Sequence, residues 1–298
     1  MDNRGAFGYP PIDPRLLESG APVPIPQRGR VARFVVYSIV ALFIVVGVGG
    51  PFLAPTEAVA GVAQAEAPHQ VVALSTNPLL TYPQSLAPGT CTLPKFGRTT
   101  DELRAYLEAE LTCLDAAWKP VVSGINLPFE STKLTMDDSS GSCRARDGSA
   151  PVAFYCGADN ELHMPVQSVL DGTDGIPAVV IGVLAHEYGH HVQDMSGILL
   201  AESRREKTAG RDTEAGLELS RRLELQANCF AGMFLASVAG RGSITKSMAA
   251  TGAAAFADGG GEKDHGTAPN QGRWAQIGYQ QNKTAACNTW AAPQGDVS

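Results

Sequence analysis

Apolar residues recur every three or four positions in four stretches of the chain, which is the spacing of one face of an α-helix. The first stretch follows a capping box made by Thr99 and Glu102. It predicts a helix over residues 101–119 that ends at Pro120, because proline cannot continue a helix. The other three predict helices over about residues 177–195, which stops at Gly197, and about 213–239 and 244–257.

Two shorter apolar segments, 152–156 and 161–164, flank the turn sequence Gly157-Ala158-Asp159-Asn160. Short apolar runs on either side of a polar, glycine-containing turn are typical of a β-hairpin. Four helices and one hairpin together predict an α+β fold that is mostly α, with a small β-sheet.

A different pattern precedes this domain. Residues 1–33 contain six prolines and little apolar periodicity, and residues 34–53 are twenty residues without a charge. A helix of that length spans about 30 Å, the thickness of the hydrocarbon core of a membrane. We therefore expect a disordered tail (1–33), a single transmembrane helix (34–54), a linker (55–87) and a folded domain (88–298).

The charges beside the apolar run predict its orientation. Arg28, Arg30 and Arg33 precede it, so the positive-inside rule places the N-terminal tail in the cytoplasm and the folded domain outside the cell membrane. A cleavable signal peptide is the alternative, because a small-x-small sequence occurs at residues 58–60.

Composition narrows the class of protein. Charged residues are 18% of the chain and its formal net charge is −7, which argues against nucleic acid as a partner. All six cysteines follow the apolar run, and an even number outside a membrane indicates disulfides. Fifteen connectivities are open; pairing of near neighbours would join Cys91–Cys113, Cys143–Cys156 and Cys229–Cys287.

The chemistry is concentrated in the predicted helix over residues 177–195. It contains the motif H-E-x-x-H, in which His186 and His190 are four residues apart and share one helix face. Two imidazoles so placed can bind one zinc ion. Glu187 is placed to act as general base on a zinc-activated water and then to protonate a leaving amine.

A third ligand is expected on the predicted helix over residues 213–239. Glu224 shares a face with the small residues Ala227, Asn228 and Ala231, which suit close helix packing. Two histidines and one glutamate, with a fourth position left open, are the ligands of a catalytic zinc site. The alternative is a surface carboxylate paired with a neighbouring arginine.

Three stretches of this sequence, HEYGHHVQ, LELQANCFAG and HGTAPNQGRW…GYQ…CNTW, resemble the neutral zinc metallopeptidase family of bacteria over about residues 88–298. The resemblance implies a zincin-like, gluzincin-type domain in which His186, His190 and Glu224 bind zinc and Glu187 is catalytic. It also implies that Cys143, Cys156, Cys229 and Cys287 belong to a shared framework.

The chain departs from the family at Asn228, where an aspartate is usual. Four residues after the glutamate ligand, this side chain is expected to orient a zinc-bound histidine. The Asn228 carbonyl can still accept a hydrogen bond from an imidazole N–H, but it lacks the charge of a carboxylate. We therefore expect the zinc ligands to be kept and the support of one of them to be weaker.

Three further side chains are candidates for stabilising negative charge on a substrate oxygen. His265 is the first, assigned here as a catalytic residue, and Tyr188 and Tyr279 are the others. The alternative for His265 is a loop histidine that bonds to the backbone. His191 lies about 140° around the helix from His186, so it is expected to pack or support rather than to bind metal.

The sequence thus predicts a membrane-anchored, extracytoplasmic zinc metallopeptidase whose substrate is a peptide or protein. Two alternatives stay open: an envelope binding or scaffold module with a structural or degenerate metal site, and a zinc hydrolase acting on a non-protein envelope polymer.

Overall fold

The computed structural model describes residues 66–137, 143, 151–259 and 263–298. The predicted tail and transmembrane helix lie outside these residues. The helices are α2 (Pro78–Thr81), α3 (Thr100–Gly124), α4 (Val166–Gly172), α5 (Pro177–Ser196), α6 (Ile198–Ala209), α7 (Glu214–Val238), α8 (Lys246–Ala255) and α9 (Ala268–Gln281). The strands are β1 (Lys133–Thr135), β2 (Phe154–Cys156) and β3 (Glu161–His163), and short 3₁₀ turns include η2 (Phe256–Asp258), η3 (Thr284–Cys287) and η4 (Thr289–Ala291). The prediction of a mostly helical α+β domain is confirmed.

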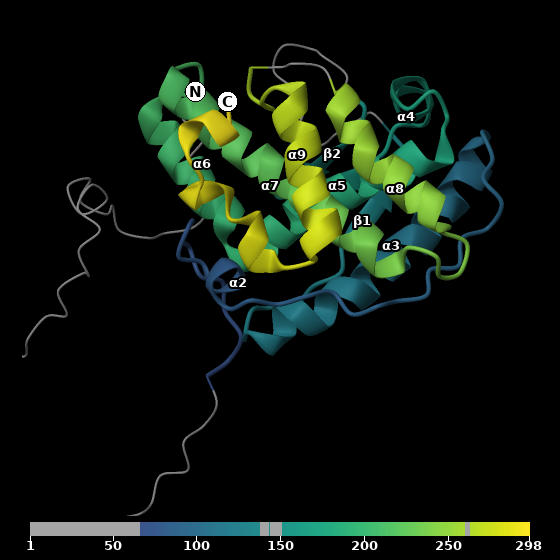
Figure 1. Cartoon of the computed structure of the whole chain (residues 1–298), viewed down its shortest axis with the longest axis horizontal. Helices are drawn as coiled ribbons and strands as arrows, with labels where there is room; N and C mark the ends of the chain where they lie inside the picture. The colour runs from purple at the N-terminus through teal and green to yellow at the C-terminus, as the bar shows by residue number, and fades with distance from the viewer. Residues whose placement is uncertain (1–65, 138–142, 144–150, 260–262) are drawn as a thin grey trace, which may run out of the picture. The chain divides into compact units, whose positions relative to one another are not determined.

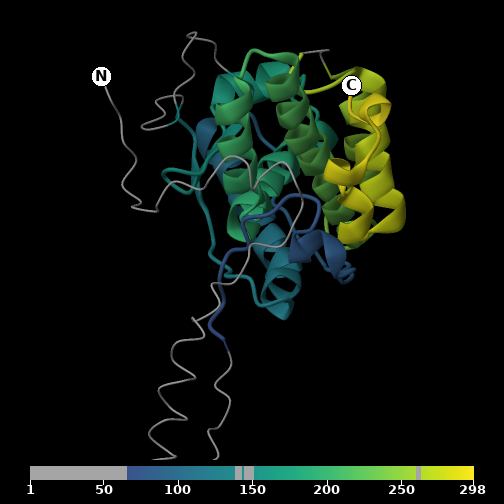
Figure 2. The ribbon, with the colours of Figure 1, turned by 90° about the vertical axis from the view of Figure 1, so that its left-hand side faces the viewer.

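The middle of the domain is a layer of long helices (Figure 1), in which α7 packs against both α5 and α9. Small residues allow this close packing. A Cβ placed on Gly189 of α5 would lie 3.0 Å from Cα of Ala227 on α7, and one placed on Gly232 of α7 would collide with the Ala275 carbonyl oxygen of α9. Figure 2 shows α9 and the C-terminal segment, in yellow, along one side of the green helices.

The sheet is small and mixed. Its order is β1-β3-β2, with β1 parallel and β2 antiparallel to β3. The predicted hairpin is therefore confirmed as β2–β3, whereas β1 is an addition. Tyr155 of β2 ties the sheet to α5, because its hydroxyl donates a hydrogen bond to Asp194 Oδ2 at 2.9 Å.

The end of α3 corrects one prediction. Pro120 lies inside this helix, which continues to Gly124. The proline removes one hydrogen bond of the last turns, but Val121 and Val122 are buried in the core just beyond it. Burial of these two side chains compensates for the lost bond, so the helix ends five residues later than predicted.

The segment before residue 88 also differs from the expected linker in its second half. Leu74, Leu79, Leu80 and Leu86 are buried in the core. Asn77 caps α2 by accepting from Leu79 N at 3.0 Å, and its side-chain amide donates to the carbonyl oxygen of Ser196 at the end of α5 at 2.9 Å. Residues 74–86 are therefore part of the folded domain.

Three disulfides join the six cysteines as Cys91–Cys113, Cys143–Cys156 and Cys229–Cys287. This is the pairing of near neighbours. Within the described ranges, no single helix is long and apolar enough to cross a membrane; α4 and α5 reach that level only taken together, and they are bent by 118° at their junction.

Candidate metal centre

The two histidines of the H-E-x-x-H motif meet at their Nε2 atoms. They lie on successive turns of α5, and the distance between His186 Nε2 and His190 Nε2 is 3.2 Å. Neither imidazole is open to solvent, since their side chains are 13% and 12% exposed. The α-helical spacing thus produces the shared face that the sequence predicts.

Glu224 of α7 completes a triangle with these atoms. Its Oε2 lies 3.2 Å from His186 Nε2 and 3.3 Å from His190 Nε2. This oxygen is buried, and it makes no hydrogen bond of normal geometry within the described residues. The close approach of α7 to α5 at Gly189 brings the carboxylate to the histidines.

The size of the triangle can be compared with a zinc site. A tetrahedral zinc ion with ligands at about 2.0–2.1 Å separates neighbouring ligand atoms by about 3.3 Å. The three observed distances are 3.2, 3.2 and 3.3 Å. Two nitrogens and one otherwise unbonded carboxylate oxygen are also the donor types that zinc prefers. His186, His190 and Glu224 therefore fit a zinc ion.

Each histidine is held on its other nitrogen by a side-chain amide. His186 Nδ1 lies 2.7 Å from Asn228 Oδ1, and His190 Nδ1 lies 2.8 Å from Gln193 Oε1. An amide oxygen accepts only, so both imidazoles donate from Nδ1 and turn Nε2 toward the centre. Asn228 thus occupies the supporting position that the sequence predicts, and Gln193 is a supporting residue that sequence reasoning missed.

Glu187 lies beside the triangle rather than in it. Its carboxylate and the two imidazoles have ligand atoms within 4.8 Å of one another, and the residue is 7% exposed. Because it is adjacent to His186 on α5, it reaches the centre from a different direction than Glu224. This position suits a carboxylate that exchanges protons with a reacting group.

His265 reaches the same centre from the loop before α9. Its Nε2 lies 3.6 Å from Glu224 Oε2, and its Nδ1 lies 2.8 Å from Asp264 Oδ1. Its side chain is 42% exposed, more than those of the other members of the centre. The structure therefore places His265 beside Glu224, at the most exposed part of the centre, which is its open side.

Two other side chains of α5, those of Tyr188 and His191, make their contacts away from the metal centre. The Tyr188 hydroxyl donates to Asp115 Oδ1 of α3 at 2.8 Å. His191 Nε2 lies 2.7 Å from the Glu130 carbonyl oxygen, and its Nδ1 lies 3.1 Å from the Tyr155 hydroxyl. The expectation that His191 packs and supports rather than binds metal agrees with these contacts.

The carboxylates and imidazoles of the centre shift one another's pKa values. Burial alone would lower the pKa of His190, but the carboxylates of Glu224 and Glu187 outweigh burial and raise that pKa to about 9. Burial alone would raise the pKa of Glu224, but the imidazoles of His190 and His186 hold it well below its usual value. The centre therefore keeps an ionised carboxylate ready to bind a cation.

Glu202 of α6 is a second residue that sequence reasoning missed. It is 5% exposed. Burial raises the pKa of its carboxyl to about 7, with Glu206 adding to the effect, and the charges of Glu224 and His190 also reach it. No sequence signal marked it, because α6 carries no metal-binding motif. At neutral pH this carboxyl is therefore only partly ionised.

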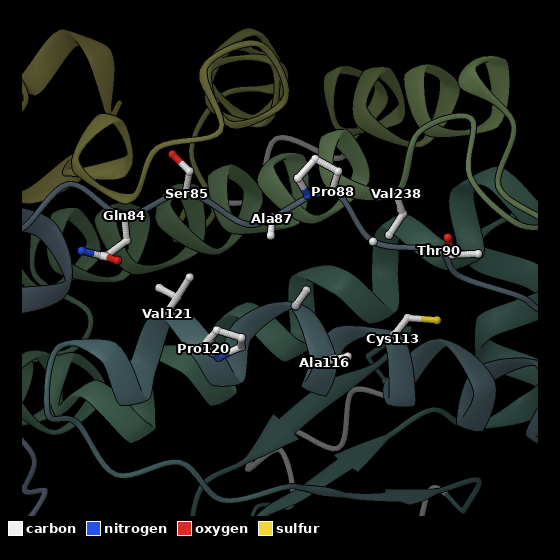
Figure 3. Close-up of a pocket in the computed structure, with 12 residues that line it drawn as sticks. Gln84, Ser85, Ala87, Pro88, Thr90, Cys113, Ala116, Pro120, Val121 and Val238 are labelled. Carbon is white, nitrogen blue, oxygen red and sulfur yellow. The ribbon is translucent and has the colours of Figure 1, made fainter.

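A cavity of about 270 Å³ lies elsewhere, between residues 84–90 and α3 (Figure 3). Ala87, Pro88, Pro120 and Val121 are among the side chains that line it, and Cys113 lies at one end (Figure 3). None of the residues of the metal centre lines this cavity. It is therefore separate from the candidate site.

The domain is mostly helical, and its candidate metal site combines the H-E-x-x-H motif of α5 with Glu224 of α7. The family described as "Putative neutral zinc metallopeptidase" matches residues 77–290. The chain belongs to this family, as its resemblance predicts.

The relatives are bacterial proteins. The chain is 29% identical over 210 residues to the uncharacterized protein Rv2575 of Mycobacterium tuberculosis, covering 60% of this chain and 68% of the relative. It is 28% identical over 211 residues to the uncharacterized protein YpfJ of Escherichia coli K12, covering 64% and 72%. No solved structure matches the chain.

Proposed function

We propose that this protein is a zinc metallopeptidase that hydrolyses peptide bonds. The single observation that carries the proposal is the triangle of His186 Nε2, His190 Nε2 and Glu224 Oε2, whose sides of 3.2–3.3 Å match a tetrahedral zinc site. When bound there, zinc supplies a Lewis acid that polarises a peptide carbonyl and makes water more acidic.

The remaining residues have roles that follow from their positions. Glu187 takes a proton from the attacking water and delivers it to the leaving amine. His265, at the open side of the centre, donates a hydrogen bond to the carbonyl oxygen as negative charge develops on it. Asn228 and Gln193 keep the two ligand imidazoles oriented.

The place of action is part of the same proposal. The uncharged residues 34–53 after Arg28, Arg30 and Arg33 favour a single membrane helix with the N-terminus in the cytoplasm. The three disulfides support an oxidising compartment for the domain. We propose that the catalytic domain lies outside the cell membrane, where its substrates are peptides or proteins.

The test combines metal content with hydrolysis. We expect the purified full chain to hold about one zinc ion, measured by elemental mass spectrometry, and to cleave members of a peptide library. Glu187→Gln should keep the zinc and lose roughly 10²–10⁴-fold in cleavage rate, because only proton transfer is removed. His190→Ala, the control, should lose both. Equal cleavage by the wild type and Glu187→Gln would rule out the proposed mechanism.

A second candidate function rests on Asn228. Its neutral amide supports His186 where a carboxylate is usual in the family, which weakens the histidine as a ligand. An envelope binding or scaffold module with a structural or degenerate metal site is the function that this feature favours. A chain that binds zinc but cleaves no peptide in the library would favour this second function.

A further inference from the structure

We propose that Gln193 and Gln226 form a directional pair of amides that sets the tautomer of His190 and connects the metal centre to the Cys229–Cys287 disulfide. The inference rests on the metal site of the proposed function. Both glutamines are fully buried, although neither is a metal ligand nor part of the H-E-x-x-H motif.

The chain of hydrogen bonds begins at His190. Its Nδ1 lies 2.8 Å from Gln193 Oε1. Gln193 Nε2 then donates to the Leu223 carbonyl oxygen at 2.8 Å and to Gln226 Oε1 at 3.1 Å. Gln226 Nε2 donates in turn to the carbonyl oxygen of Cys287 at 3.0 Å.

The orientation of Gln226 follows from partners that can play only one role. The Cys287 carbonyl oxygen can only accept, so the Gln226 NH₂ group must face it. The indole N–H of Trp290 can only donate, and it lies 3.3 Å from Gln226 Oε1. These two contacts, on opposite ends of the amide, both require the same orientation of Gln226.

The same reasoning fixes Gln193 and then His190. Gln226 Oε1 and the Leu223 carbonyl oxygen both accept, so the NH₂ group of Gln193 must face them and its Oε1 must face His190. An amide oxygen cannot donate, and His190 Nδ1 therefore carries the proton. The lone pair of the neutral imidazole is left on Nε2, the atom that lies at the metal centre.

The far end of the chain is held covalently. Cys287 lies in η3 and is bonded to Cys229 of α7. This bond keeps the Cys287 carbonyl against the helix that also carries Glu224 and Gln226. The segment η3 is therefore connected both to α7, which carries Glu224, and, through Gln226 and Gln193, to His190 of α5.

Zinc affinity of the full chain, measured by competition with a chelator, tests this proposal. We expect Gln193→Met, which keeps the length of the side chain but removes the amide, to raise the dissociation constant for zinc about 10–100-fold. Gln226→Met should raise it less, because the Leu223 carbonyl still orients Gln193. The proton on His190 Nδ1 should exchange with solvent faster in both variants, as seen by ¹⁵N NMR of the zinc-loaded protein.

Asn77→Leu is the matched control. Asn77 is also a fully buried amide that donates to backbone carbonyls, at Val71 and Ser196, but it contacts no member of the metal centre. We expect zinc affinity to be unchanged in this variant. An equal rise in the dissociation constant for Gln193→Met and Asn77→Leu, or no rise for Gln193→Met, would overturn this inference alone. A wild-type chain that binds no zinc would overturn the proposed function as well.

Discussion

Two amides, rather than carboxylates, support the two histidines of the proposed zinc site. Asn228 and Gln193 each accept one hydrogen bond from an imidazole, at 2.7 and 2.8 Å. A neutral acceptor fixes the ring but adds no negative charge, so the histidine is a weaker electron donor to zinc than it would be beside a carboxylate. A substitution at Asn228 can add the missing negative charge while the imidazole of His186 stays oriented.

Replacing Asn228 by aspartate restores the charge without changing the shape of the side chain. We expect Asn228→Asp to lower the dissociation constant for zinc about 10-fold, because the carboxylate strengthens the bond to His186 Nδ1. Titration of zinc against a chelator measures this. Weaker binding by the variant would mean that burial of the added charge, at a residue 3% exposed, outweighs its benefit.

Glu110 of α3 gives a prediction for the effect of pH on stability. It is fully buried, and neither carboxyl oxygen has a hydrogen-bond partner within the described residues. Burial raises the pKa of this carboxyl well above its usual value. The folded chain therefore holds a proton that the unfolded chain releases above about pH 4.5, and the stability contributed by this proton is lost as the pH rises toward the folded-state pKa.

Glu110→Gln removes this proton while keeping the size of the side chain. We expect the free energy of unfolding to fall less steeply with pH in the variant than in the wild type above about pH 5. The difference in slope is at most about 1.4 kcal/mol per pH unit, the value for one proton. Urea unfolding at several pH values measures it, and parallel curves for the two proteins would show that Glu110 is ionised in the folded chain.

At the scale of elements, close contacts between helices decide where the site residues lie. Gly278 of α9 faces the backbone of α7, and a Cβ there would collide with the carbonyl oxygen of Cys229. We expect Gly278→Ala to destabilise the domain by about 1–3 kcal/mol, because α9 must move away from α7. Thermal unfolding should show a midpoint several degrees lower, at about 2–4 °C per kcal/mol for a domain of this size.

Gly124→Ala is the control for this prediction. Gly124 is the last residue of α3, and nothing lies within 4 Å of a Cβ placed there. Because alanine reduces the freedom of the unfolded chain, this variant should be unchanged or slightly more stable. Similar losses at both glycines would show that helix contact is not the cause.

The long helices are predictable from sequence because large apolar residues repeat along them. The same signal fails for α9, whose buried residues include Gly272, Ala275 and Gly278, too small to register as an apolar face. It also fails for α6, because the composition of this helix is polar. The sequence correctly predicts that α5 ends before Gly197, but not that a new helix begins directly after it.

The residues of the candidate site also fall into those that the sequence predicts and those that it does not. His186, Glu187 and His190 can be predicted because one helix turn relates them. Gln193 and Gln226 act through bonds between α5, α7 and η3, which no local spacing encodes. Supporting residues of this kind are found only when distant segments are placed together.

Across the whole domain, hydrogen bonds join the C-terminal segment to α7 and to the residues before α3, which are distant in the sequence. The Thr284 N–H donates to the carbonyl oxygen of Gln84, and the Gln84 N–H donates to the Thr284 hydroxyl. Arg222 of α7 donates to the carbonyl oxygens of Thr289 and Ala292. The C-terminal segment thus fastens α7 to the residues before α3, and Cys229–Cys287 is its covalent link.

Removal of that link should affect both stability and metal binding. The bond closes a loop of 58 residues, and the loss of such a crosslink costs about 4 kcal/mol in the chain-entropy estimate. We expect the double variant Cys229→Ala/Cys287→Ala to lose roughly this free energy of unfolding. It should also bind zinc more weakly, because the Cys287 carbonyl no longer holds Gln226 in place.

The disulfide Cys91–Cys113 separates these two effects. It closes a loop of 22 residues, for which the same estimate gives about 3 kcal/mol, and it has no hydrogen-bonded connection to His190 among the described residues. We expect Cys91→Ala/Cys113→Ala to lose stability with its zinc affinity unchanged, when both double variants are measured where they are folded. Equal zinc affinities in the two would show that the metal centre does not depend on the C-terminal disulfide. A difference confined to Cys229→Ala/Cys287→Ala would mean that a bond in the C-terminal segment governs how well the histidines of α5 hold a metal.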